Sequence, residues 1–284
     1  MKKYFIPYEI TESAAKTFVK KFHYSPIMPK HTSHFLGFYE EQELIAVITL
    51  GHGTRPRHTI NAMFPSLEVL NKNEIGEWKV RELRDVYFEI GKMCIDDRMP
   101  TNTASRMLKT TRYWISKNYP KTLFLYTMAD GLMGKVGGVY KASGFYFGEK
   151  FKAESYMMEN NEKLHPRSTA DLCKKNAAIR GKDKMARIDT NFMVENKIRH
   201  IEGYNFRYIF PLNKKAEKIM KEDQTIDWTK DKDRFPNKER DLKWFDTTED
   251  RFEIDMPEFS FDKMKFNPQT KSQSDTFDLS SYFN

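Results

Sequence analysis

The sequence predicts an α/β (α+β) fold with a mixed, mostly antiparallel central sheet flanked by helices. Residues 34–40 and 43–51 alternate or run apolar around a short polar turn, which is typical of an antiparallel hairpin. Residues 123–128 form a second apolar run of strand length. Between these runs, residues 11–22 and 103–118 carry apolar side chains at helical spacing. Strands and amphipathic helices in one chain indicate a layered α/β domain.

The elements follow one another along most of the chain. The first part should hold a strand at 2–10, a helix at 11–22 that Thr11 caps, the hairpin at 34–51 and a long irregular connection at 51–79. A strand at 82–96, with Gly91 as a bulge or splay point, a helix at 103–118, a strand at 123–128 and a helix at 132–143 that Gly144 ends should follow. The last part should hold a strand at 145–158, a mixed basic segment at 164–202, a strand at 204–210 and a helix at 214–221.

Composition bounds the class of protein. The 284 residues include two cysteines without CxxC spacing, so neither a disulfide framework nor a zinc ribbon is indicated, and a cytoplasmic setting is expected. The first residues lack the apolar stretch of a signal peptide, and no apolar window approaches the about 18 residues of a membrane span. The net charge of +8 is uneven, since residues 221–284 hold 11 basic and 16 acidic residues. Residues 1–220 are therefore strongly basic, which is typical of a protein that binds a polyanion such as nucleic acid, or simply of a basic soluble surface.

The character of the chain changes near residue 213. Residues 1–212 are predicted to form the catalytic domain. Residues 213–284 are acidic, with isolated aromatic side chains, and are predicted to form an extended C-terminal arm or tail that packing orders at least in part.

The order of elements resembles the GNAT acyltransferase fold, in which a splayed strand and the start of the next helix hold acyl-CoA. Free N–H groups at a helix N-terminus attract phosphate for general physical reasons. The corresponding turn here spans residues 97–106, and it lacks the glycine-rich loop that is usual in GNAT enzymes. A capped helix without a ligand is the alternative. The candidate contacts to acyl-CoA (acetyl-CoA) are Lys92, Met93, Cys94, Arg98, Asn102, Thr103, Ser105 and Arg106.

Several motifs lie in a fixed order between about residues 20 and 150. They are His23-Tyr24-Ser25, Gly51-His52-Gly53, residues 89–94, Pro100 with Ser105-Arg106, Ala129-Asp130, residues 137–142 and residues 145–148. In order and spacing, these motifs resemble the Mom family of phage DNA-modification proteins. The chain departs from the family at Lys92, where arginine is common, at Tyr126, where serine is common, and in its long C-terminal arm. The resemblance implies a GNAT-like enzyme that converts adenine in phage DNA to a carbamoylmethylated base and shields the DNA from restriction.

By position, the resemblance implies functional roles for His23, Tyr24, Lys92, Ser105, Asp130 and Tyr140. Asp130 would accept a proton from the adenine amine, or else it forms an Asx turn before Gly131. Tyr140 would protonate a departing thiolate, or else it packs on the sheet. His23 and Tyr24 would supply a base and a stacking ring for a flipped purine, or else His23 simply ends a helix. Ser105 would contact the cofactor or lie in the first turn of its helix, and Lys92 would meet a phosphate or lie at a solvent-exposed strand edge.

Metal and DNA contacts are less sharply indicated. Five of the histidines fall within the first sixty residues, but without HxH or HxxxH spacing, so a metal site stays open and iron is possible. A sheet crevice is expected where the strand at 123–128 ends before Asp130 and the following helix carries Tyr140, because open α/β sheets place ligands at such crevices. The candidate DNA-binding residues, which flank loops near this crevice, are Lys30, Arg55, Arg57 and Arg84.

We therefore expect a GNAT-like transferase that acts on adenine in double-stranded DNA in a phage-infected bacterial cell, with an acyl-CoA donor and a possible homodimer. The alternatives are an ordinary GNAT N-acyltransferase acting on a protein or small amine, and a catalytically silent DNA- or protein-binding anti-defence module.

Overall fold

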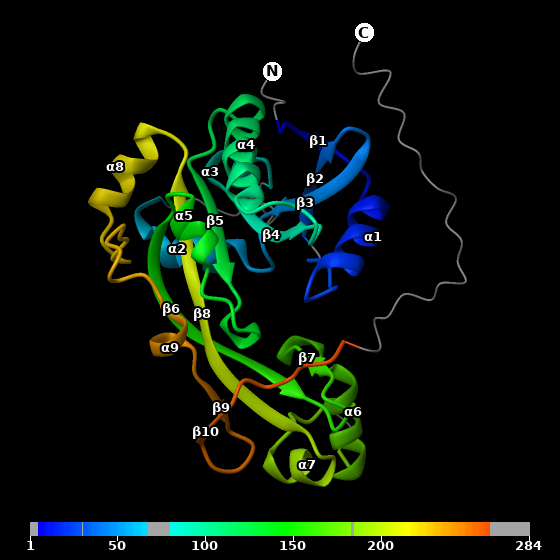
Figure 1. The fold of residues 1–284 in the computed structure, drawn as a ribbon. Helices are drawn as coiled ribbons and strands as arrows, with labels where there is room; N and C mark the ends of the chain where they lie inside the picture. Colours follow the sequence, from blue (N-terminus) through cyan, green and yellow to red (C-terminus); the bar gives the residue numbers. More distant parts are fainter. Residues whose placement is uncertain (1–4, 30, 68–79, 183–184, 262–284) are drawn as a thin grey trace.

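One large sheet runs through the protein (Figure 1). The computed structural model describes residues 5–29, 31–67, 80–182 and 185–261. The strand order is β1-β2-β3-β4-β5-β8-β6-β7, with β9 attached to β8 and β10 to β9. Of the paired strands, β4 and β5 are parallel and the other pairs are antiparallel. The strands are β1 (Pro7–Glu9), β2 (Thr32–Glu40), β3 (Glu43–Gly51), β4 (Tyr87–Ile95), β5 (Phe124–Ala129), β6 (Tyr146–Met157), β7 (Lys163–Leu164), β8 (Arg199–Pro211), β9 (Trp244–Asp246) and β10 (Phe252–Ile254).

Helices flank this sheet, as the sequence predicts. They are α1 (Glu12–Phe22), α2 (Pro56–Met63), α3 (Val80–Val86), α4 (Thr103–Asn118), α5 (Gly138–Ala142), α6 (Ala170–Ile179), α7 (Thr190–Glu195), α8 (Lys214–Glu222) and α9 (Lys238–Asp241), with 3-10 turns η1 (Pro65–Leu67), η2 (Gly131–Met133) and η3 (Pro166–Ser168). Among the described residues, no helix is long and apolar enough to cross a membrane. The mixed α/β class with a largely antiparallel open sheet is confirmed.

The two faces of the sheet carry different helices. Successive residues of a strand point to opposite faces, so Tyr87 and Phe88 belong to different cores. Phe88 packs with Met107 and Leu108 of α4, on what we call the α4 face. Tyr87 packs with residues of α2, α3 and α8, and Val47 packs with α1, on what we call the α1 face.

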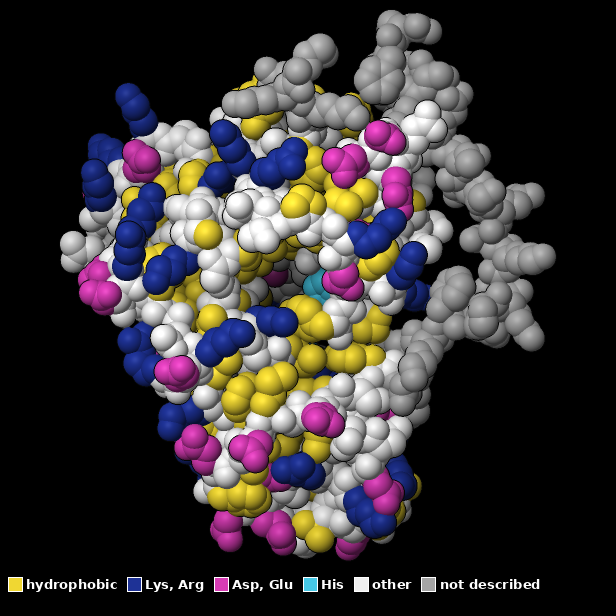
Figure 2. All heavy atoms as spheres, viewed as in Figure 1, with side chains coloured by type: hydrophobic (Ala, Val, Ile, Leu, Met, Phe, Trp, Pro, Cys, Tyr) yellow, Lys and Arg dark blue, Asp and Glu magenta, His cyan; other side chains and the backbone are white. Residues whose placement is uncertain are grey.

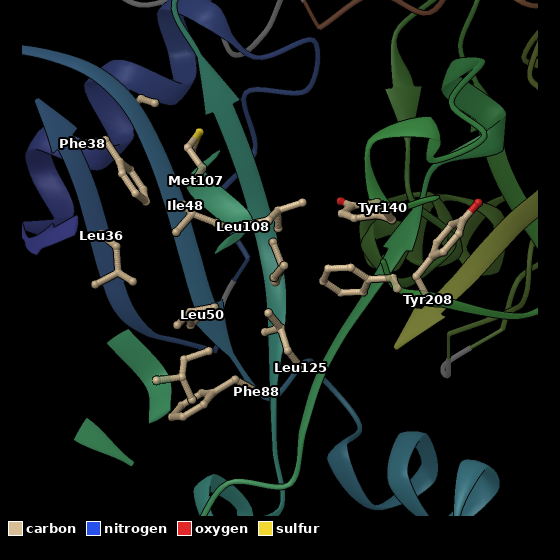
Figure 3. Close-up of a cluster of buried hydrophobic side chains, with 14 of the residues drawn as sticks. Leu36, Phe38, Ile48, Leu50, Phe88, Met107, Leu108, Leu125, Tyr140 and Tyr208 are labelled. Carbon is tan, nitrogen blue, oxygen red and sulfur yellow. The ribbon is translucent and has the colours of Figure 1, made fainter. Parts of the chain in front are cut away.

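The parallel pair β4–β5 separates soon after it begins. Tyr87, Phe88 and Glu89 pair with residues 124–126, and no pairing follows. Beyond Glu89 the strand β4 stays paired with β3, while β5 stays paired with β8. Gly91 is the extra residue of a bulge, because Lys92 and Ile90 face successive residues of β3. Figure 3 shows the two strands close together near Leu125 and apart at the level of Tyr140. The predicted bulge at Gly91 is confirmed, and the sheet forks there.

Many of the predicted elements are confirmed. Thr11 caps α1 by accepting a hydrogen bond from the N–H of Ala14. The hairpin forms as β2 and β3, and the helix at 103–118 forms as α4. The connection at 51–79 contains α2 and η1, and part of it lies outside the described residues.

Two predicted elements are wrong in part. The strand expected at 82–96 begins only at Tyr87, because Leu83 and Val86 lie at helical spacing and are buried on one side of α3. The helix expected at 132–143 is interrupted, because Gly134 and Gly137 adopt the left-handed φ values of +70° and +80°. Only residues 138–142 are α-helical, and Gly144, with φ +77°, ends the helix as predicted.

Residues 213–261 lie against the rest of the chain. The ring of Phe235 is buried near Phe147 and Tyr208, and Trp228 stacks on Phe64. β9 then pairs with β8 near the far end of the β6–β8 ribbon, beside α6 and α7 (Figure 1). The domain boundary at residues 212/213 stays a prediction.

We expect Gly137→Ala to lower the free energy of unfolding by about 1–3 kcal/mol, because a side chain at a left-handed φ is strained. An added Cβ would also lie 2.5 Å from the ring of Tyr208. Gly138→Ala is the matched control, since its Cβ meets nothing within 4 Å. Equal unfolding free energies of the two variants in chemical denaturation would contradict the structural role of Gly137.

Candidate functional site

The fork between β4 and β5 holds a cavity of about 360 Å³, which we call the fork cavity. Residues 90–93 of β4 form one wall, and residues 127–129 of β5 form the other together with Asp130. His23 and Tyr24, at the end of α1, close it on the α1 face, whereas Tyr140 of α5 closes it on the α4 face. The loop 134–139 and Lys238 complete the lining. The cavity therefore connects the two faces of the sheet at the one place where backbone pairing is missing between β4 and β5.

A second cavity of about 640 Å³ lies on the α1 face, over β5, β8 and β6. We call it the arginine cleft, after Arg55 and Arg207 in its lining. Its wall includes Glu89, Tyr126, Phe151, Lys152, Lys163, His165 and Asn205. Met128 and Asp130 line both this cleft and the fork cavity. The two cavities thus meet at the carboxyl end of β5.

Asp130 lies at this junction, one residue after β5 ends. Its backbone carbonyl accepts hydrogen bonds from Met133 and Lys135, which shapes the following turn. Gly131 lets that turn approach β8 closely, because a Cβ there would lie 1.9 Å from the carbonyl oxygen of Tyr204. The Asp130 side chain makes no capping hydrogen bond and is 3.4 Å from the ammonium of Lys163. With a side chain 30% exposed, Asp130 is an accessible carboxylate rather than an Asx-turn residue.

Tyr140 borders the fork cavity from the α4 face. Its ring is 8% exposed and packs near Phe145 and Tyr208. The hydroxyl of Thr127 donates to the Tyr140 hydroxyl at 3.2 Å. Burial raises the pKa of Tyr140, so the phenol stays protonated and can act as a proton donor.

His23 and Tyr24 face the cavity from the other side, with ring centroids 4.2 Å apart. The Ser25 N–H donates to His23 Nδ1 at 2.9 Å. Burial, and then the charge of Lys92, lower the pKa of His23 to about 4, so the ring is neutral near pH 7. Since Nδ1 accepts a hydrogen bond, Nε2 carries the proton and offers a donor. Tyr24 is 42% exposed, and the ammonium of Lys135 lies 5.4 Å from its ring centroid.

Lys92 lies inside the fork cavity rather than at a solvent-exposed strand edge. Its ammonium donates to the carbonyl of Ser25 at 3.0 Å. Burial lowers the pKa of Lys92 to about 8, an effect that the carboxylate of Asp130 opposes. The Lys92 side chain is thus mostly in its ammonium form at neutral pH, and the carboxylate of Asp130 helps to keep it so.

The other candidate cofactor residues are dispersed. Met93 lines the fork cavity, but Cys94 packs under α1, and Arg98 is bound by Asp96 and Glu43. Thr103 donates its hydroxyl to Pro100, and Arg106 lies over the ring of Phe5.

Asn102 and Ser105 belong to the first turn of α4. Asn102 has a φ of +76° and gives α4 no side-chain cap, while Ser105 is half-buried. Neither residue lines the fork cavity or the arginine cleft.

Of the candidate DNA-binding residues whose side chains the structure describes, one lines one of the two cavities and the other does not. Arg55 is exposed and lines the arginine cleft. Arg84 is half-buried, with its guanidinium 5.9 Å from the ring centroid of Tyr119. Lys30 and the side chain of Arg57 lie outside the described residues.

Sequence reasoning missed Glu89, Lys163 and Arg207 as site residues. Glu89 and Arg207 are charged residues that lie between apolar or aromatic neighbours in their strands, and a charge at such a position could have indicated a site residue. Lys163 belongs to a two-residue strand that no periodicity could reveal. Burial raises the pKa of Glu89 to about 7. Its carboxylate sits against Gly53, where an added Cβ would lie 2.4 Å from Glu89 Oε2.

One cluster of side chains that could hold a metal lies away from the fork. Across the described residues, three His, Cys, Asp or Glu side chains come within ligating distance of one another at Glu154, His200 and Glu202, on the β6–β8 ribbon. Glu202 already pairs with Lys152 and Arg251. Neither Asp130 nor His23 belongs to such a group, and iron at the fork stays a prediction.

We expect Asp130→Asn to lower the pKa of Lys92 further below 8, because the carboxylate charge that favours the ammonium is removed. An NMR titration of protein with ¹⁵N-labelled lysine, following the Lys92 Nζ signal, measures this shift. Asp171→Asn is the control, since the side chain of Asp171 is fully exposed and pairs with Lys174. A Lys92 signal that titrates near pH 10.4, as model lysines do, would contradict the burial of this ammonium.

Comparison with known proteins places the chain in a family. The sequence model of the Mom protein family matches residues 5–227, which include both cavities except Lys238. The methylcarbamoylase Mom of Escherichia phage Mu is 26% identical over 206 residues, which cover 72% of this chain and 75% of the phage Mu protein. The matched segment spans β1 to β8 and continues past α8. The chain therefore belongs to the Mom protein family.

Proposed function

We propose that this protein is a phage DNA-modifying enzyme that transfers a carbamoylmethyl or acyl-type group to the exocyclic amine of adenine, which would protect the DNA from restriction. The name of the phage Mu relative, a methylcarbamoylase, supports the transfer of a small group that contains a carbamoyl unit. The observation that carries the proposal is the position of Asp130, which lines both cavities. A transferase for two substrates needs a proton acceptor where the donor and the acceptor molecule meet.

The fork supports a GNAT-like arrangement of the donor. An acyl-CoA thioester would enter the fork cavity from the α4 face, where α4 begins without a side-chain cap and leaves N–H groups for phosphate. Tyr140 closes the cavity on this same face. The residues of the 97–106 turn would thus contact the distant part of the donor, while Lys92 and Met93 would lie beside the transferred group.

The arginine cleft supports binding of the base on the opposite face. A base in duplex DNA is accessible to this chemistry only when it is flipped out of the stack. The cleft volume lies within the roughly 300–1,000 Å³ of ligand pockets. The guanidinium of Arg207 lies 4.9 Å from the ring centroid of Phe151, which makes a flat wall suited to a purine. Lys and Arg side chains lie around the hollow in Figure 2, where phosphates of the DNA could bind.

The proposed step is a nucleophilic substitution. The N6 nitrogen of adenine forms a bond to the electrophilic carbon of the donor, and the bond between that carbon and the leaving group breaks. Asp130 takes the proton that N6 loses, and Tyr140 gives a proton to the leaving thiolate. His23 Nε2–H and the Lys92 ammonium would donate to the oxygen that gains negative charge. With a thioester donor, the products are an N6-acyl adenine and a free thiol.

We expect Asp130→Asn to lower DNA modification by roughly 10²–10⁴-fold, because a positioned general base contributes that much. The measurement is mass spectrometry of nucleosides from plasmid DNA after expression of the wild-type chain, of Asp130→Asn and of Asp171→Asn as the exposed control. The mass of the modified deoxyadenosine identifies the added group. Unmodified DNA from cells that contain folded wild-type protein would contradict the proposed function and favour a different amine as the substrate.

A further inference from the structure

Glu89 has no role in the reaction described so far, although it lines the arginine cleft beside Asp130. We propose that Glu89 recognises the target adenine as a neutral carboxylic acid, donating a hydrogen bond to ring N1 and accepting one from the exocyclic amine. This inference rests on the proposed function, since it assigns the base to the arginine cleft.

The fold holds Glu89 rigidly at this position. It is the last residue of β4 that pairs with β5, opposite Tyr126, and it also pairs with Gly51 of β3. Strand alternation places Tyr126 and Met128 on the same side of β5, and both line the cleft. Asp130 lies two residues beyond Met128, at the same cleft. A base on this wall would therefore lie between the two carboxyl groups.

The surroundings of Glu89 favour its neutral form. Within the described residues, no hydrogen bond or ion pair to its carboxyl group is found, whereas Asp130 has Lys163 and Glu149 has Arg207. Burial without a cationic partner disfavours a carboxylate, and the pKa of Glu89 is about 7. Glu89 and Asp130 are thus in different environments, since Asp130 is paired with an ammonium and Glu89 has no partner among the described residues.

A second unpartnered group lies in the same cleft. The Arg207 Nε–H is buried and has no hydrogen-bond partner among the described residues, because the guanidinium bonds Glu149 through Nη1. Buried polar groups normally have a partner, so an orphaned donor and an unpartnered carboxyl group from residues that line one cleft indicate a polar ligand. A planar base would rest on the Phe151–Arg207 wall with its polar edge toward these groups.

The chemistry of the carboxyl group selects the edge of the base. Adenine presents an acceptor, N1, next to a donor, the exocyclic amine. A neutral carboxylic acid offers one donor and one acceptor side by side and matches this pair. An ionised carboxylate could only accept, and it would face the N1 lone pair with its own. Contact at N1 would also hold the amine toward Asp130.

The first arm of the test measures binding near pH 6.5, with duplex oligonucleotides that carry adenine or 1-deazaadenine at one target position. The wild-type protein should bind adenine more tightly by about fivefold or more, because 1-deazaadenine lacks the N1 acceptor. Glu89→Gln should keep this preference, since its amide also pairs a donor with an acceptor. Glu89→Ala should lose it. Glu253→Gln, an exposed carboxyl group in β10, is the matched control and should keep it. Circular dichroism and thermal unfolding verify that each variant folds.

The second arm measures nucleoside modification. Glu89→Gln should still modify DNA. The activity of the wild-type protein should fall as the pH rises through about 7, because Glu89 then loses its proton. This loss of activity with rising pH should be absent in Glu89→Gln, because the amide does not titrate. Loss of modification in Glu89→Gln together with wild-type activity that rises through this pH would overturn the inference and make Glu89 a general base.

The two arms separate this inference from the proposed function. Equal wild-type binding of adenine and 1-deazaadenine, with modified deoxyadenosine still formed, would overturn the role of Glu89 alone. A preference that depends on Glu89, without any modified nucleoside, would support the recognition and overturn the proposed chemistry. No binding to either oligonucleotide would overturn both.

Discussion

The separation of β4 from β5 is the constraint on which the site depends. Two parallel strands that stop pairing leave backbone groups without their sheet partners, and buried backbone groups must be satisfied in another way. Here β4 keeps β3 and β5 keeps β8 as antiparallel neighbours, so each strand retains one complete ladder. The sheet can then open between them and still remain one continuous sheet. The fork cavity is the result.

The fork also explains why functional groups arrive from both faces. Thr127 and Tyr140 lie on the α4 face, whereas Lys92 and His23 lie on the α1 face, and all four meet at one cavity. A closed sheet would separate them by a layer of backbone. Burial at this point shifts several pKa values in directions that suit proton transfer, since it keeps the phenol of Tyr140 protonated and His23 neutral.

Much of this arrangement could be predicted from the sequence, and the exceptions have physical reasons. The hairpin, α1 and α4 have strong periodicity, and the glycine in β4 marked the fork. The interruption of the 132–143 segment depends on the left-handed φ values of Gly134 and Gly137, which an otherwise helical pattern conceals. Asp130 and Tyr140 were expected at one crevice because a strand end and the following helix meet there. Glu89 and Arg207 come together only through the pairing of β4 with β5 and of β5 with β8, and one sequence does not reveal that register.

The wall that the C-terminal segment adds to the fork has an evolutionary consequence. Phe235 packs on Tyr208, which supports Tyr140, and Lys238 lines the fork cavity itself. Both residues lie beyond position 227, where the match to the family ends. Strands β1 to β8 and the groups from both sheet faces that line the fork therefore lie in the part of the chain that matches the family, while one side of the cavity is built from sequence outside it. Substitutions in this outer segment can reshape the fork cavity without changing the part of the chain that matches the family, so relatives that differ there can differ in the molecule that the cavity accepts.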